Sequence, residues 1–363
     1  MTFVRRSHLW LGLITAVAVI AVSITGILLN HPEGFGLVGE VPATPAGSLE
    51  TALGPLDLAD AAVAGAGEAG LSLPFPEINR VVYRPGDNQV TVRFNDPQVT
   101  EVVVEANTGT VVAIAPRTEV TVDDLHSGAI IGNRGVILSD LAGVALVVLV
   151  IGGIALWIRR LQPRWRAADT ERSPSAWMLF NRRFHLIGGL VVAVTTVVIS
   201  VTGIMLNHKR GLELMVEPVR KFDAEEVADS APQSLAQIAE WGIAARERSG
   251  LTSSSEIRSI DYRPFRGYAK VRFDDGLDTE VIIDVYDGDV LSSARRLDGL
   301  IEQLHSGAIF GDGWILLSDV TAGVLILLTV NGLYLWLAPA WRARTRAAGA
   351  LATETAPREE ERV

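Results

Sequence analysis

The apolar residues of this chain gather in four blocks of about twenty residues that contain almost no charge. The blocks are residues 10–29, 136–158, 186–206 and 314–337. At 1.5 Å per residue, each block forms a helix long enough to cross a hydrocarbon core of roughly 30 Å. The pattern predicts an integral membrane protein with four spans. The first block is too long for the apolar part of a signal peptide, so it is expected to be a retained anchor.

The two segments between the first and second blocks and between the third and fourth show a different pattern. Each opens with an alanine-rich stretch, residues 49–70 and 234–248, and continues with three or four runs of alternating apolar and polar residues. Turn sequences such as "EANTGTVV" and "DVYDGDVL" close these runs. Helical stretches followed by alternating strands predict a small α+β domain in each segment.

The second half of the chain repeats the first at an offset of about 178 residues. "SITGILLNH" matches "SVTGIMLNH", "DLHSGAIIGNRGVILSD" matches "QLHSGAIFGDGWILLSD", and "VVYRPGDNQVTVRF" matches "IDYRPFRGYAKVRF". Two spans per half return the chain to the same side, so we expect an all-α four-helix membrane bundle with a pseudo-two-fold axis along the membrane normal. The expected boundaries are 1–31, 134–158, 184–208 and 313–338 for the spans, 32–133 and 209–312 for two extracytoplasmic α+β domains, 159–183 for an arginine-rich connector and 339–363 for a polar tail.

Charge distribution gives the orientation and excludes one class of partner. Arginines cluster before the first block, in the connector 159–183 and after the fourth block, so the positive-inside rule places both termini in the cytoplasm. The outer segments are acidic, with 14 Asp and Glu against 4 Lys and Arg in 32–133, and 20 against 13 in 209–312. An acidic chain of this kind is not expected to bind nucleic acid. The absence of cysteine excludes disulfides, iron–sulfur clusters and covalent haem attachment.

All six histidines fall into three pairs related by the repeat: His8 with His185, His31 with His208, and His126 with His305. Ionisable residues at membrane spans usually mark a functional site. Imidazoles from two facing helices can provide the axial ligands of a b-type haem. His8 and His31 are 23 residues apart, about 34 Å along a helix, so they belong to opposite faces of the bilayer.

These depths predict one or two haems. His8 and His185 form the cytoplasmic-side pair, and the other four histidines gather on the outer side. Either outer pair could bind a second iron. His126 and His305 are preferred, with His31 and His208 as outer-site ligands or as residues that support the ligands.

Several other paired residues are candidates for supporting roles. Gly12 and Gly189 follow His8 and His185 by one turn and leave room for a flat macrocycle, or else allow close helix packing. Asp140 and Asp319 could orient a ligand histidine or lie as interfacial carboxylates. The remaining paired polar residues in the spans, Thr25 and Thr202 among them, are expected to satisfy the backbone or neighbouring helices.

The motifs "HLWLG" and "HLIGG", "LHSG" before a span, and "ALW" or "YLW" at its end resemble the PepSY-associated transmembrane family over roughly residues 5–345. Some members are ferric-siderophore reductases of the bacterial inner membrane that bind b-type haem between four spans. The resemblance implies that His8, His185, His126 and His305 match the family's recurrent histidines, and that the electron acceptor is a ferric chelate on the outer side. No G-x-G-x-x-G fingerprint is present, so the expected donor is a separate cytoplasmic flavoprotein or a quinol.

Two other functions fit the same residues. A metal transporter or metal-handling protein would use the histidines directly. Transporters usually carry broken or polar helices at the midplane, and these blocks are smoothly apolar there apart from Thr15, Thr195, Thr196 and Asn331. A non-enzymatic scaffold would use the outer domains to bind a partner, and it would not need six paired histidines. The sequence therefore favours a haem-b membrane oxidoreductase.

Overall fold

A computed structural model describes residues 2–45, 47–161, 176–218, 220–229, 231–250, 256–275 and 278–354 of the 363. The chain forms two compact units. One, called here the helical unit, comprises Met1–Ile27, His126–Ile204 and His305–Val363, and the other, the sheet unit, comprises Leu28–Leu125 and Met205–Leu304. Each unit is therefore assembled from both halves of the sequence.

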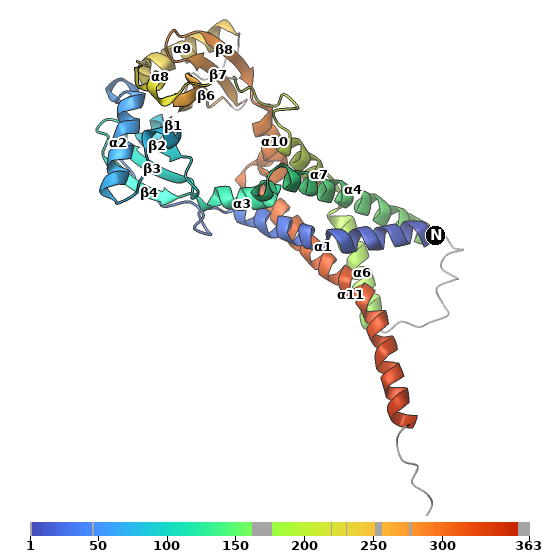
Figure 1. The fold of residues 1–363 in the computed structure, drawn as a ribbon. Helices are drawn as coiled ribbons and strands as arrows, with labels where there is room; N and C mark the ends of the chain where they lie inside the picture. Colours follow the sequence, from blue (N-terminus) through green and yellow to red (C-terminus); the bar gives the residue numbers. More distant parts are fainter. Residues whose placement is uncertain are drawn as a thin grey trace, which may run out of the picture. The chain divides into compact units, whose positions relative to one another are not determined.

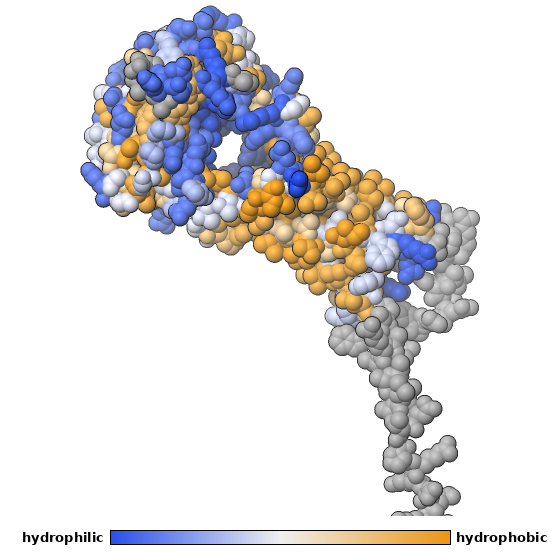
Figure 2. Space-filling view, viewed as in Figure 1, coloured by the Kyte–Doolittle hydropathy of each residue, from blue (hydrophilic) through white to orange (hydrophobic). Residues whose placement is uncertain are grey.

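Long apolar helices make up the helical unit (Figure 1). They are α1 (Thr2–Asn30), α4 (Asn133–Leu161), α6 (Ala176–Val191), α7 (Ala193–Asn207) and α11 (Ile315–Glu354). Three of the described helices are long and apolar enough to cross a membrane, and α6 with α7 makes a fourth span if the two count as one. Figure 2 shows the hydrophobic residues gathered over these helices, and side chains such as Val17 are 80% exposed. Exposed apolar surface of this extent is the surface that lipid covers, so the chain is a membrane protein.

The third predicted span is bent. The sequence predicts one helix over 184–208, whereas α6 and α7 meet at Val192 at an angle of 57°. Gly188 and Gly189 precede the bend, and the Thr195 hydroxyl donates to the Val192 carbonyl at 3.0 Å. Glycine pairs and side-chain hydrogen bonds into the backbone ladder are known causes of helix kinks. The prediction of an uninterrupted helix was wrong for this reason.

The sheet unit contains one antiparallel sheet of eight strands in the order β4-β3-β2-β1-β5-β6-β7-β8. The strands are β1 (Ile78–Arg84), β2 (Gln89–Phe94), β3 (Thr100–Glu105), β4 (Val111–Pro116), β5 (Ile257–Arg263), β6 (Tyr268–Phe273), β7 (Thr279–Asp284) and β8 (Val290–Arg295). The two predicted sets of strands join where β1 pairs with β5, with Val82 opposite Asp261. The expectation of two separate small domains is corrected here: the two segments share one sheet.

Helices cover one face of the sheet and create a common core. They are α2 (Pro55–Glu68) and α9 (Leu235–Arg248), whereas the short helix α8 (Ala224–Asp229) contacts the turn Pro264–Arg266. Leu58 of α2 and Ile238 of α9 belong to the same buried cluster as Val81, Ile260 and Val271. Because side chains alternate along a strand, the residues between these core positions lie on the opposite face of the sheet.

Two short helices connect the units along the chain. They are α3 (Thr118–Ser127) and α10 (Leu297–Ser306), and each ends in the sequence "LHS". Most of the predicted connector 159–183 and the end of the predicted tail 339–363 lie outside the described residues, whereas α11 continues past the predicted span to Glu354.

Candidate functional site

Four of the six histidines meet in the helical unit as two face-to-edge pairs. The ring centroids of His126 and His305 are 6.0 Å apart, with their planes at 81°. Those of His8 and His185 are 6.4 Å apart, with their planes at 84°. Each pair contains one histidine from each half of the chain, as the repeat predicts.

The "HSG" sequence explains how His126 and His305 reach their positions. Each histidine occupies the last turn of a short helix, and the glycine two residues later has a positive φ of +83° at Gly128 and +88° at Gly307. A side chain at Gly128 would stand 2.3 Å from the Gly135 carbonyl oxygen, so only glycine permits this turn. The turn leads the chain from the short helix into α4 in the first half and into α11 in the second.

Threonines from the spans hold the Nδ1 atoms of this pair. Thr25 Oγ1 lies 2.9 Å from His126 Nδ1, and Thr202 Oγ1 lies 3.1 Å from His305 Nδ1. Each hydroxyl also lies 2.7–2.8 Å from a carbonyl one turn back in its own helix, to which it must donate its one proton. The hydroxyl oxygen can therefore only accept from the imidazole, so Nδ1 carries the ring proton.

The backbone supports the same tautomer. His305 Nδ1 lies 3.0 Å from the Ile199 carbonyl oxygen, which is an acceptor only. A proton fixed on Nδ1 leaves the Nε2 lone pair available for a metal, and this second hydrogen bond is what orients most metal-bound histidines.

Glycines let the span helices approach the rings of the His126 and His305 pair. A Cβ on Gly26 would lie 3.2 Å from His126 Cε1, and a Cβ on Gly203 would lie 3.0 Å from His305 Cε1. Burial lowers the pKa of His126 to about 4, with His305 adding to the effect, and burial also lowers the pKa of His305. Both imidazoles are therefore neutral near pH 7, which is the form that binds a metal.

The His8 and His185 pair is held more loosely. The nearest glycines are Gly152 and Gly153 for His8 and Gly332 for His185, whose Cβ positions would lie 3.4–3.6 Å from ring atoms. Both Nδ1 atoms are buried and point toward the backbone, but neither makes a hydrogen bond of normal geometry within the described part of the chain.

The structure distributes the other predicted residues as follows. Gly12 and Gly189 face Leu149 and Leu328, at 3.8 and 3.9 Å from their Cβ positions. Asp140 and Asp319 are half-buried in α4 and α11. His31 and His208 belong to the sheet unit. Sequence reasoning missed the roles of Thr25, Thr202, Gly26 and Gly203, although all four lie in the repeated "S-[IV]-T-G-I" segments.

The distance between the ring centroids would leave room for a metal ion between the two imidazoles of each pair. Two metal–nitrogen bonds of about 2 Å in line, plus one ring radius at each end, place imidazole centroids about 6 Å apart. The measured separations are 6.0 and 6.4 Å. The two imidazoles of a pair would provide two ligands to such a metal, and a haem macrocycle would provide four more. Among the described residues, no cluster of three or more His, Cys, Asp or Glu side chains is placed to hold a metal ion.

These features define a helical membrane protein with two histidine pairs and an eight-stranded sheet unit. The family model for the PepSY-associated TM region matches residues 5–241 and again residues 182–356. The chain therefore belongs to this family, as the sequence resemblance predicted. No curated protein matches the chain.

Proposed function

We propose that this chain is a haem-b transmembrane oxidoreductase that passes electrons to a metal complex on the extracytoplasmic side, namely a ferric chelate. The observation that supports the proposal best is the pairing of His126 with His305 and of His8 with His185 at the spacing of axial ligands. In this proposal the spans form a four-helix bundle in a bacterial-type inner membrane, with both termini in the cytoplasm.

The residues present fit the group that the proposal requires. His126 and His305 are half-buried and neutral, and their Nδ1 protons are directed at Thr25 and Thr202, so Nε2 of each would be available to bind iron. His8 and His185 would hold the second haem. When bound, haem b supplies one-electron transfer at iron, a chemistry that no side chain of this chain provides.

The protein's own part is to hold ligands and exclude water. The imidazoles of His126 and His305 do not protonate near neutral pH, and the apolar spans surround them with low dielectric. A separate cytoplasmic flavoprotein or a quinol would donate the electrons.

Absorption spectra of the detergent-purified protein, oxidised and then reduced with dithionite, test the proposal. We expect a Soret band that shifts on reduction with a sharpened α-band, and a pyridine haemochrome value of two haems per chain. A colourless protein from haem-replete cells would contradict the proposal and favour a metal-handling protein or a scaffold.

A further inference from the structure

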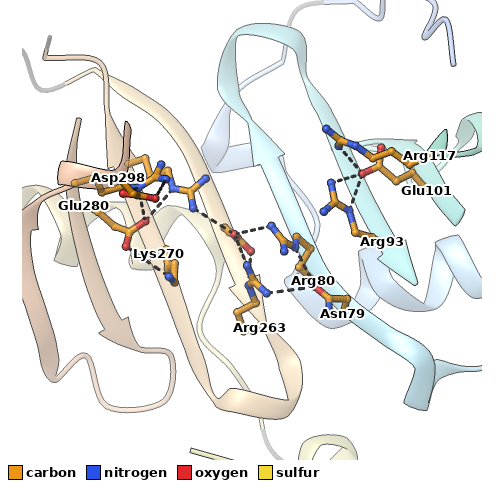
Figure 3. Close-up of polar contacts among 12 residues, drawn as sticks. Asn79, Arg80, Arg93, Glu101, Arg117, Arg263, Lys270, Glu280 and Asp298 are labelled. Atoms are coloured by element: carbon orange, nitrogen blue, oxygen red, sulfur yellow. Dashed lines mark hydrogen bonds and ion pairs between the residues drawn. The ribbon is translucent and has the colours of Figure 1, made fainter. Parts of the chain in front are cut away.

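The face of the sheet opposite α2 and α9 carries charged side chains instead of apolar ones. Core residues such as Val81, Ile260 and Val271 alternate along the strands with Arg80, Asp261 and Arg272. The β1–β5 pairing places the charged residues of both halves next to each other on this face. Figure 3 shows two neighbouring groups of these side chains: Lys270 of β6 directed toward Glu280 of β7, and Arg80 of β1 beside Arg263 of β5.

This charged face lines a cavity of about 710 Å³ within the sheet unit, called here the basic cavity. Its volume lies in the range typical of pockets for small molecules. Nine basic side chains line it: Arg80, Lys209, Arg210, Lys221, Arg263, Arg266, Lys270, Arg272 and Arg296. Only two carboxylates, Glu217 and Asp298, are among the described lining residues.

Two further carboxylates lie behind the lining, and several cations share each of them. Asp261 is 2.9 Å from Arg263, 3.6 Å from Arg80 and 3.8 Å from Arg272. Glu280 is 2.9 Å from Arg272, 3.6 Å from Lys270 and 3.8 Å from Arg296. Three more described carboxylates act on the lining from farther away: Asp123 and Glu302 on Lys209, and Asp278 on Arg296. Counting all of these, seven described carboxylates face nine cations, so the basic cavity keeps an excess of positive charge inside an acidic protein.

The first half of the chain contains a matching set of ion pairs in which positive and negative charges are balanced. There, Arg93 and Arg117 share Glu101, and Arg117 also pairs with Glu119, so two cations meet two carboxylates. The second half repeats this arrangement with Arg272, Arg296, Glu280 and Asp298. It adds Lys270 at the position that Thr91 occupies in the first half.

Lys270 is a buried cation and Arg80 is a half-buried one, and each lies 3.6 Å from its carboxylate partner, Glu280 and Asp261 respectively. The Lys270 side chain is 1% exposed, and its Nζ lies 3.4 Å from the Val216 carbonyl oxygen and 3.6 Å from Glu280, longer than normal hydrogen bonds. Burial lowers the pKa of Lys270, and it lowers that of Arg80 to about 10, although Asp261 opposes the shift at Arg80. A buried charge is unfavourable unless it is paired, so a bound anion would stabilise both cations.

We propose that the basic cavity binds a small, soluble polyanion that carries several carboxylate or phosphate groups. Each guanidinium group of Arg80, Arg263 and Arg272 has more N–H donors than its contact with Asp261 uses. A guanidinium group can bind two oxygens of one carboxylate or phosphate at once. The proposal stands on the sheet unit alone and does not depend on haem in the helical unit.

Isothermal titration of the full detergent-purified chain with citrate and with inorganic pyrophosphate tests the proposal. We expect one saturable site per chain whose affinity falls as salt rises. The Lys221→Gln/Arg266→Gln double variant removes two lining cations without touching Asp261 or Glu280, and it should weaken binding at least about tenfold, because hydrogen bonds to charged groups are strong. The matched control, Arg248→Gln/Arg258→Gln, removes two cations of the same unit that do not line the cavity, and it should bind as the parent does.

Three results would overturn the proposal: no saturable binding of either anion in the millimolar range, equal weakening by the cavity and control variants, or unchanged binding in the cavity variant. A lipid headgroup is the other source of the same phosphate chemistry. The titration is therefore repeated in nanodiscs of phosphatidylcholine with and without phosphatidylglycerol. If phosphatidylglycerol abolishes citrate binding, the assignment to a soluble ligand is overturned. Equal citrate binding in the two kinds of nanodisc supports the assignment.

Discussion

The two histidine pairs have nearly the same ring spacing, but the protein holds them in different ways. In the His126 and His305 pair, each Nδ1 contacts a threonine hydroxyl, and a span glycine leaves only 3.0–3.2 Å between its Cβ position and the ring. In the His8 and His185 pair, neither Nδ1 makes a hydrogen bond of normal geometry to a residue that the structure describes, and the neighbouring glycines leave 3.4–3.6 Å between their Cβ positions and the rings.

The difference indicates how much of each site exists before a ligand binds. Imidazoles with both the tautomer and the ring plane fixed lose little freedom when they coordinate a metal. The His126 and His305 pair is therefore the more preorganised site. The His8 and His185 pair has more freedom to adjust when a ligand enters.

Removing one histidine from either pair should have the largest effect. We expect His305→Ala and His185→Ala each to lower the haem content from two per chain to one, because a six-coordinate haem loses an axial ligand in each case. The pyridine haemochrome assay measures the content, and the reduced α-band shows which haem remains. His208→Ala is the matched control and should keep both haems. If the His208→Ala control also lost a haem, His208 and not His305 would be assigned as the outer ligand.

Alanine in place of the glycines that contact the histidine rings should affect the two pairs differently, because the distance between the glycine and the ring differs. The Cβ of Gly203→Ala would lie 3.0 Å from His305 Cε1, whereas that of Gly332→Ala would lie 3.6 Å from His185 Cε1, an ordinary contact. His305 is held by Thr202 and the Ile199 carbonyl and cannot move aside easily, so overpacking should cost about 1–3 kcal/mol.

Haem occupancy and the thermal midpoint measure these effects. Gly203→Ala should lower both, and Gly332→Ala should change neither. If both substitutions change haem occupancy and the thermal midpoint equally, the His126 and His305 pair is packed no more closely than the His8 and His185 pair.

The sequence predicted the elements well and their junctions poorly. Apolar blocks of membrane length and alternating strands are local patterns, and the repeat placed His8 with His185 and His126 with His305. The joining of β1 to β5 was not predictable from either segment alone, because edge strands pair through backbone groups that every sequence offers. The bend at Val192 depends on a threonine hydroxyl whose choice of partner is set by the fold.

The supporting residues of the site were missed for a related reason. Thr25 and Thr202 were expected to satisfy the backbone, and they do donate to carbonyls one turn back. Their oxygens retain an acceptor site, and the imidazoles use it. Gly12 and Gly189 were chosen because they follow a histidine on its own helix, whereas Gly26 and Gly203 contact histidines about a hundred residues away. Only the tertiary packing of helices identifies such residues.

Valine in place of the threonines should give the smallest effect and test the preorganisation argument most directly. Thr25→Val keeps the side-chain volume but cannot accept the hydrogen bond from His126 Nδ1–H, so the site should lose about 0.5–1.5 kcal/mol of stability. The ligand also becomes less basic without this acceptor, which should raise the reduction potential of the haem bound there. Thr15→Val is the matched control, because Thr15 lies in the same helix and donates to Leu11 in the same way without contacting a histidine.

Redox titration of each variant, followed at the α-band, should show one of the two midpoints rising in Thr25→Val and neither changing in Thr15→Val. If both variants leave the midpoints unchanged, the contact to Thr25 holds the helix in place but does not tune the ligand, and the contrast between the two pairs is one of packing alone.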